Sequence, residues 1–146
     1  MIKLLSTISL ALFMSPLAQP SLPSVDEASF RCMMETLYHE ARGEGVQGMG
    51  AVASVVMNRA RQANKSVCSI VYERKQFSWV FVTKDKGIKG NIRDVLSITH
   101  KALAGYLEDV TGGATHYHAT YVKPKWAKHL KKTVKINNHI FYKENK

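Results

Sequence analysis

The stretch Leu37-Tyr38-His39-Glu40-Ala41-Arg42-Gly43-Glu44 decides the fold of this chain, because an amphipathic helix meets a glycine-rich break there. Upstream, Ser24 and Glu27 have the spacing of a capping box, which predicts a helix start at Ser24. Gly43 and Gly45 end the pattern, since glycine readily adopts the positive φ angles of helix C-caps. Between these limits the apolar residues repeat at helical spacing, at Phe30, Met34, Leu37 and Ala41.

Glu40 is placed by this pattern in the last turn of the helix, where the macrodipole disfavours an anion. Partial burial would act in the same direction, and both effects raise the pKa of a carboxyl group. A general acid that works near neutral pH needs such a raised pKa, so Glu40 is a candidate catalytic acid. The alternative is a solvated helix end that carries ordinary surface charges.

Two further helices are predicted, at residues 46–62 and 92–107. The first of these is almost uniformly apolar, which is typical of a buried central helix. Segments 115–122 and 133–142 have strand-like composition, and we expect them to pair as a β-hairpin across a long connection. The predicted fold class is therefore α+β, a mainly helical core with a C-terminal antiparallel β-hairpin.

Composition is that of a globular protein with one domain. The 146 residues are 45% hydrophobic, which is enough for a single core. There are 21 basic residues against 11 acidic ones, giving a formal net charge of +10. This charge favours anionic partners such as nucleic acid, teichoic acid, acidic lipids or the carboxylates of peptidoglycan stem peptides. We expect no nucleic-acid partner, because no base-reading or base-stacking motif accompanies the charge.

The N-terminus has the pattern of an export signal. Lys3 precedes an apolar stretch over residues 4–18, which is too short for an ordinary membrane span. We assign residues 1–23 to a signal peptide or signal anchor with a linker, and residues 24–146 to the folded domain. Pro16 is a poor residue before a cut at Ala18, so a retained anchor with transient membrane association is the alternative. Either form directs the protein to the periplasm, the cell wall or the extracellular space.

The chain contains two cysteines, Cys32 and Cys68. An even count in an exported protein favours one disulfide bridge. Two free buried thiols are the alternative. A catalytic role is disfavoured, because neither cysteine has a charged setting that would favour the thiolate.

Several motifs occur in a fixed order between residues 30 and 142: YHEARGE (38–44), AVA (51–53), NR (58–59), VCSIVY (67–72), QFSW (76–79), THYHA (115–119) and PKW (124–126). In this order they resemble the SleB-type cell wall hydrolases, a family of spore-cortex lytic enzymes that also occurs in Gram-negative bacteria and phages. The resemblance implies a lysozyme-like fold related to lytic transglycosylases, and peptidoglycan as the substrate. Glu40 matches the position of the family's catalytic glutamate.

The chemistry expected of this family depends on the number of carboxylates. A glycosidase with two carboxylates needs a second acid across the scissile bond. The acids beyond Glu44 stand in solvated contexts, and the glycines around Glu44 leave its direction open. A mechanism with one glutamate and no cofactor therefore fits best. The resemblance to lytic transglycosylases implies that Glu40 protonates the glycosidic oxygen and then activates the sugar's own 6-hydroxyl, leaving a 1,6-anhydro-muramoyl end.

Aromatic and polar residues in loop-like contexts are the candidates for the sugar cleft. Aromatic rings with a polar group suit such a surface because they can be apolar and wet at once. Phe77 and Trp126 fit core packing at least as well. The predicted substrate-binding residues are Glu44, Gln76, Ser78, Trp79, Tyr117 and His118.

Two other classes of protein compete with this interpretation. A metal-dependent amidase or endopeptidase would use His116 and His118, which share one face of a predicted strand. Zinc needs a third protein ligand, and the His39-Glu40 run lacks the second histidine of an H-E-x-x-H site. A non-catalytic peptidoglycan-binding module would not need a carboxylate at a helix end. We expect a monomeric enzyme that uses no metal.

Overall fold

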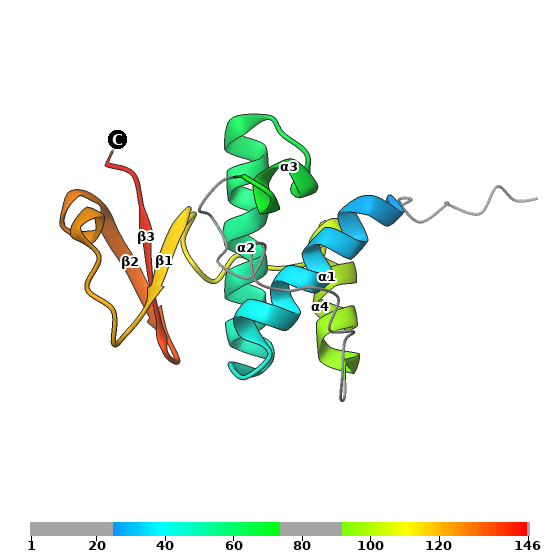
Figure 1. Ribbon diagram of the computed structural model, residues 1–146, viewed down its shortest axis with the longest axis horizontal. Helices are drawn as coiled ribbons and strands as arrows, with labels where there is room; N and C mark the ends of the chain where they lie inside the picture. Colours follow the sequence, from blue (N-terminus) through cyan, green and yellow to red (C-terminus); the bar gives the residue numbers. More distant parts are fainter. Residues whose placement is uncertain (1–24, 74–91, 146) are drawn as a thin grey trace, which may run out of the picture.

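The computed structural model describes residues 25–73 and 92–145 of the chain. Helices come first and a small sheet follows (Figure 1). The elements are α1 (Glu27–Ala41), α2 (Gly45–Ala63), α3 (Val67–Val71), α4 (Arg93–Leu103), β1 (His116–Ala119), the 3-10 helix η2 (Lys125–His129), β2 (Lys131–Ile136) and β3 (His139–Lys143). The α+β class is confirmed. No helix in the described ranges is long and apolar enough to cross a membrane.

Helix α1 begins two residues later than the capping-box spacing predicts. Its N-cap is Asp26, whose Oδ1 accepts a hydrogen bond from the Ser29 backbone N–H at 2.8 Å. The prediction of Ser24 as the cap is therefore wrong, because the Asp26 carboxylate satisfies the free N–H of the first turn. The predicted end of the helix holds. Helix α1 ends at Ala41, and Gly45 adopts a φ of +66° where the chain turns into α2.

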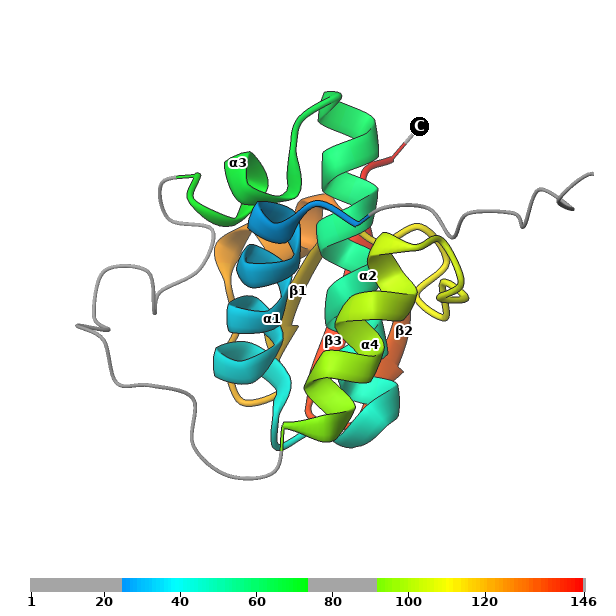
Figure 2. The ribbon, with the colours of Figure 1, turned by 90° about the vertical axis from the view of Figure 1, so that its right-hand side faces the viewer.

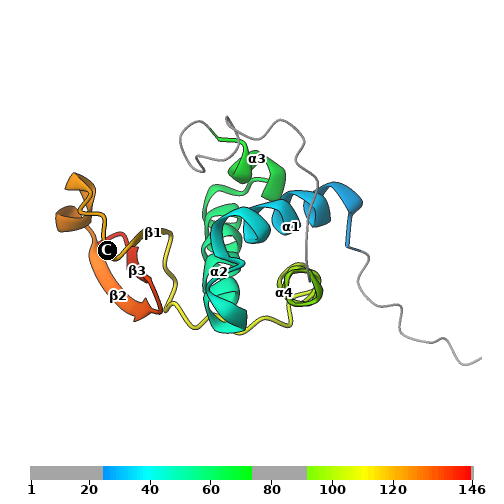
Figure 3. The ribbon, with the colours of Figure 1, turned by 60° about the horizontal axis from the view of Figure 1, so that its bottom comes forward.

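Helix α2 stands between the other helices and the sheet, as Figures 1 and 3 show. One side of it packs on α1, α3 and α4 with side chains that include Val52 and Val56. The other side packs on the sheet through Ala51 and Val55, which meet the buried Phe141. Burial on two sides explains why its sequence is almost uniformly apolar.

Helix α4 is shorter than predicted. It ends at Leu103, and Gly105 follows with a φ of +80°. Val95 and Thr99 of the helix are buried, whereas Tyr106, inside the predicted bounds, lies beyond the helix and is 64% exposed. Figure 2 shows α4 beside α1 and α2, and all three helices contact one another.

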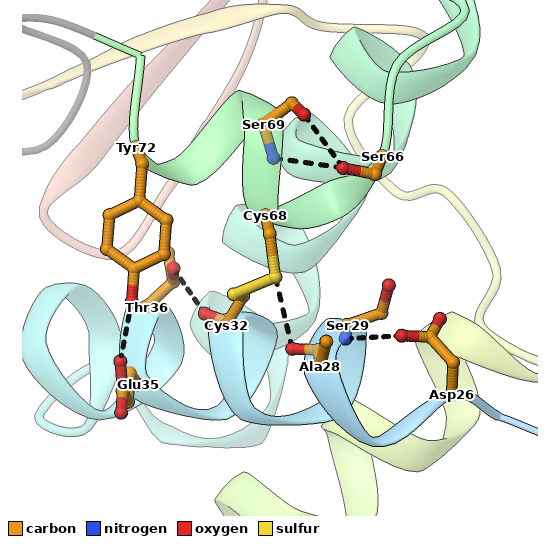
Figure 4. Close-up of a disulfide and its surroundings, with 10 residues drawn as sticks. All are labelled: Asp26, Ala28, Ser29, Cys32, Glu35, Thr36, Ser66, Cys68, Ser69 and Tyr72. Atoms are coloured by element: carbon orange, nitrogen blue, oxygen red, sulfur yellow. Dashed lines mark hydrogen bonds between the residues drawn. A yellow bond between two sulfur atoms is a disulfide. The ribbon is translucent and has the colours of Figure 1, made fainter.

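A disulfide joins Cys32 of α1 to Cys68 of α3 and confirms the predicted bridge (Figure 4). The two cysteines are 36 positions apart in sequence, and their Cα atoms are 5.3 Å apart. In the chain-entropy model, closing a loop of this length stabilises the fold by about 4 kcal/mol. The bridge attaches the short helix α3 to the outer side of α1.

The sheet has three antiparallel strands in the order β1-β3-β2, not the two that the sequence predicted. The predicted strand 133–142 is itself most of a hairpin, because the chain turns back at Asn137, which has a φ of +47°. Asparagine tolerates this left-handed conformation better than most residues. β1 then pairs with β3, so that Tyr117 lies opposite Phe141 and His118 lies opposite Ile140.

Candidate active site

Glu40 and Tyr117 form the centre of the candidate active site. Glu40 lies one residue before the end of α1, and Tyr117 comes from β1 of the sheet. The Tyr117 hydroxyl donates a hydrogen bond to Glu40 Oε2 at 3.0 Å. The two elements therefore meet at this pair, although 77 positions separate them in sequence.

The surroundings of Glu40 favour its protonated form. Burial raises the pKa of the Glu40 carboxyl, and the hydrogen bond from Tyr117 opposes part of that rise. Burial, with the nearby Glu40 carboxylate, raises the pKa of Tyr117 well above its ordinary value. Tyr117 consequently stays protonated and keeps donating, whereas Glu40 is the group that can exchange a proton. These are the properties expected of a general acid supported by a fixed donor.

Tyr117 is held in place by rings of the neighbouring strand. Its ring meets the edge of the His139 ring, with centroids 5.1 Å apart, and lies 5.7 Å from the Phe141 ring. The charge of Arg59 in α2 favours the ionised form of Tyr117, an effect smaller than that of burial. The sequence predicted Tyr117 as a sugar-stacking residue. In the structure its hydroxyl binds the candidate acid, and contact of Tyr117 with a sugar stays a prediction.

Asn58 and Arg59 attach the start of β1 to α2. Asn58 Nδ2 donates to the Ala114 carbonyl at 3.0 Å, and Arg59 Nε donates to the Thr115 carbonyl at 2.5 Å. These bonds set the position of the strand that carries Tyr117.

Glu44 lies four residues beyond Glu40 in sequence. Its carboxylate accepts hydrogen bonds from the β2–β3 turn. Its Oε2 accepts from the Asn138 backbone N–H at 3.1 Å, and its Oε1 accepts from Asn138 Nδ2 at 3.3 Å. The Glu44 carbonyl also accepts from Asn137 Nδ2 at 2.6 Å. His139 Nδ1 lies 3.8 Å from Oε2. These contacts attach the hairpin to the α1–α2 turn, and they describe an anchor for the fold.

His118 does not share a face of the sheet with Tyr117. Successive residues of a strand point to opposite faces, and the rings around His118 are those of Trp126 and Tyr142. Its Nε2 lies 2.9 Å from the Tyr142 hydroxyl. The structure therefore does not bring His118 together with Glu40. Trp126 lies on the same face, half-buried against the rings of His116, His118 and Tyr142, and is not part of the hydrophobic core. Gln76, Ser78 and Trp79 lie outside the described residues.

His116 and His118 point to the same face of β1, as a metal site would require. However, His116 Nδ1 lies 3.0 Å from Thr115 Oγ1, and His118 Nδ1 lies 2.8 Å from the Ala119 carbonyl. Across residues 25–73 and 92–145, no group of three or more His, Cys, Asp or Glu side chains is arranged to hold a metal ion. The described part of the chain thus offers these two histidines no third ligand.

Sequence reasoning missed the role of His139. Its ring lies between Tyr117 and the Glu44 carboxylate, and burial lowers its pKa while Glu44 opposes this. The alternation of residues 139–142 could have placed His139 and Phe141 on one face of a strand. That His139 contacts Tyr117 depends on strand pairing, which no local pattern reports.

Comparisons with known proteins agree with one another. A family model described as Cell Wall Hydrolase matches residues 43–142. Curated spore cortex-lytic enzymes of Bacillus cereus and Halalkalibacterium halodurans are each 30% identical, over 76% and 75% of this chain. These matches cover 42% and 33% of the relatives, so the chain spans less than half of their length.

Solved structures give the same result. The catalytic domain of the germination-specific lytic transglycosylase SleB from Bacillus anthracis matches with a TM-score of 0.71 and 27% identity, over 83% of this chain and 98% of that one. The catalytic domain of the Bacillus cereus SleB protein matches with a TM-score of 0.70, again at 27% identity and over 83% of this chain, and 94% of that domain is covered. The helical core with its C-terminal sheet is thus a fold shared with these domains.

Proposed function

This chain belongs to the Cell Wall Hydrolase family, and from that membership we propose that it cleaves the glycan strands of peptidoglycan. The bond cut is the one between N-acetylmuramic acid and N-acetylglucosamine. The observation that carries the proposal is the half-buried Glu40, whose pKa is raised by burial and whose carboxylate accepts the Tyr117 hydroxyl. Likeness to SleB lytic transglycosylase domains supports the reaction type.

Glu40 performs both proton transfers in this mechanism. The protonated carboxyl donates its proton to the glycosidic oxygen as the bond to C1 of the muramic acid breaks. The carboxylate that forms is stabilised by the Tyr117 hydroxyl, since hydrogen bonds to an ionised acceptor are the stronger ones. It then takes the proton of the muramic acid 6-hydroxyl, whose oxygen bonds to C1. The product is a 1,6-anhydro end, Glu40 is protonated again, and no water is consumed.

A single carboxylate is favoured over a pair by the position of Glu44. Its oxygens accept hydrogen bonds from Asn138 and its side chain is only 12% exposed. A second catalytic carboxylate would have to face the sugar from the opposite side of the bond. Glu44 joins the hairpin to the α1–α2 turn, and we assign it this structural role rather than the predicted contact with substrate. Gln76, Ser78 and Trp79 remain proposed cleft residues, and the enzyme is proposed to be a monomer without a cofactor.

An extracytoplasmic location follows from the substrate of the family, since the cell wall lies outside the membrane. We propose residues 1–23 as the signal peptide or anchor that takes the chain there, and residues 24–146 as the catalytic domain. Expression in a bacterial host, followed by fractionation and N-terminal sequencing, tests this. A mature chain that begins near residue 19 indicates cleavage, an intact N-terminus in the membrane fraction indicates an anchor, and recovery in the cytosol contradicts export.

The test of the function is mass spectrometry of the fragments released from purified sacculi by wild type and by Glu40→Gln. We expect anhydro-muramoyl ends from the wild type, and a loss of about 10²–10⁴-fold in the variant. Glu35→Gln is the matched control, because Glu35 lies on the same helix and its carboxylate accepts only the Tyr72 hydroxyl in the described part of the chain. Reducing ends would indicate a muramidase, and free peptides an amidase. Retention of more than about a tenth of the activity by Glu40→Gln would reject Glu40, because general acid catalysis is worth more than that.

A further inference from the structure

Positive charge is concentrated in the C-terminal sheet. Residues 123–145 contain seven lysines and one acidic residue, Glu144, and so carry six of the ten net positive charges of the chain. Six of the seven lysines are exposed. None of these seven lysines forms a salt bridge with another described residue. The charge is therefore available to a partner outside the chain.

A groove of about 920 Å³ lies between the C-terminal end of α2 and the sheet. Three cations line it, namely Arg61 from α2, Lys131 from β2 and Lys143 from β3. Neither Glu40 nor Tyr117 belongs to its lining. In Figure 1 the C-terminal ends of α2 and β3 both lie toward the top of the molecule, and the α1–α2 turn lies at the bottom. The groove is thus a site apart from the candidate catalytic pair.

Two of these cations lie side by side on neighbouring strands of the sheet. Lys131 and Lys143 are directly paired in the register of β2 and β3. Like charges at directly opposite positions destabilise a sheet. Lys143 Nζ reaches the Gly112 carbonyl at 3.2 Å, whereas no hydrogen bond or ion pair is recorded for the Lys131 side chain among the described residues. An anion held between them would relieve this repulsion.

The groove also holds one carboxylate. Glu144 lies in its lining, and its Oε2 accepts from Gln62 Nε2 at 3.3 Å. A ligand that matches this lining carries several anionic groups and an amino group. Peptidoglycan stem peptides have this composition, since they carry free carboxylates and the amine of a diamino acid. The planar fork of Arg61 suits a carboxylate in particular. Nucleic acid fits less well, because none of the described residues that line the groove is aromatic and able to stack on a base.

We propose that this groove is a second peptidoglycan site, which binds the free carboxylates of stem peptides and keeps the enzyme on its polymer. The proposal rests on the proposed wall substrate. It assigns the groove a binding role and no part in catalysis. Lysines elsewhere on β2 have an ordinary explanation, because lysine on an edge strand discourages pairing with other chains. Lys132 and Lys135 are such residues, and they are absent from the groove lining.

The test compares two double variants, Arg61→Gln with Lys131→Gln, and Lys132→Gln with Lys135→Gln. Each removes two exposed positive charges, and only the first pair removes them from the groove. Both are made in the Glu40→Gln protein, and binding to purified sacculi is measured by sedimentation in the cold. We expect the groove pair to bind about 5-fold more weakly and the control pair less than about 2-fold, as for partly exposed ion pairs. Sacculi with amidated carboxylates should abolish the difference.

Three results would overturn the proposal. Equal losses in the two pairs would mean that only net charge matters. Unchanged binding by the groove pair would mean that the groove does not touch the wall. A loss of binding to a DNA duplex, with sacculus binding intact, would assign the groove to nucleic acid. Thermal melts check the fold, and Lys131→Gln alone serves if the double variant is unstable. Failure of the proposed function would show in a different measurement. Wild-type protein would then release no fragments from sacculi.

Discussion

Replacing Glu44 by alanine is predicted to loosen the attachment of the β2–β3 hairpin to the α1–α2 turn. The Glu44 side chain is 12% exposed, and its two oxygens accept hydrogen bonds from Asn138 at 3.1 and 3.3 Å. Alanine removes both. The bond from Asn137 Nδ2 persists, because it goes to the backbone carbonyl of Glu44. The turn should therefore stay near its position but become less stable.

The size of the effect follows from the stronger of the two bonds. A hydrogen bond to a charged group contributes about 1.5–3 kcal/mol. The bond at 3.3 Å adds little, and Asn138 is exposed, so water replaces part of what is lost. We therefore expect Glu44→Ala to lower the free energy of unfolding by about 2 kcal/mol. For a domain of this size this corresponds to a fall in Tm of roughly 4–8 °C.

Thermal and urea unfolding measure this change, and sacculus cleavage is followed in parallel. Glu27→Gln is the control, because Glu27 is 90% exposed and its pair with Arg31 contributes about 0–1 kcal/mol. Activity should fall together with stability, because His139 and Phe141 of the same hairpin support Tyr117. A Glu44→Ala protein that melts like wild type yet no longer binds sacculi would refute the anchoring argument and restore Glu44 as a substrate ligand.

Further outcomes are expected from the same contacts. Tyr117→Phe removes the hydrogen bond that lowers the Glu40 pKa, so the alkaline limb of the pH profile of kcat/KM should move to higher pH; an unmoved limb would belong to another group. Since the Glu40 pKa is raised by folding, the native state holds its proton to higher pH than the unfolded chain, and ionisation of Glu40 weakens stability. Glu40→Gln should therefore melt above wild type at pH 7 and equal to it below about pH 4.5, its ordinary value, in scanning calorimetry. Cys32→Ser with Cys68→Ser should cost about 4 kcal/mol in urea titrations, and thiol labelling of denatured wild type should find no free thiol. Cleavage should survive EDTA; loss restored by zinc would favour a metal-dependent amidase.

The helices could be predicted because their signals are local. Apolar spacing located α2 to within one residue at each end, since its periodicity and its flanking glycine lie within one stretch of chain. The sheet was predicted less well. The turn at Asn137 carries no glycine or proline, so 133–142 read as one strand. The order β1-β3-β2 depends on pairing across more than twenty residues, and no period in the sequence reports that.

The candidate site was also predictable only where its signals are local in sequence. Glu40 could be located because a helix end and a family motif coincide there. Its contact with Tyr117 could not, because that contact depends on how β1 is anchored to α2 through Asn58 and Arg59. The separation of His118 from Tyr117 follows from alternation along a strand, which the sequence offered once β1 was assigned.

Glu40 and Glu44 show how one helix end can give two carboxylates different tasks. Glu44 is surrounded by donors from the hairpin, which stabilise its charge and use it to join two parts of the fold. Glu40 accepts a hydrogen bond from one donor among the described residues, Tyr117, and burial raises its pKa. An acid must be able to lose and regain a proton, so too many donors would hold it permanently ionised. The Tyr117 hydroxyl orients the Glu40 carboxylate and, together with burial, leaves it able to return to the protonated form in which the proposed reaction begins.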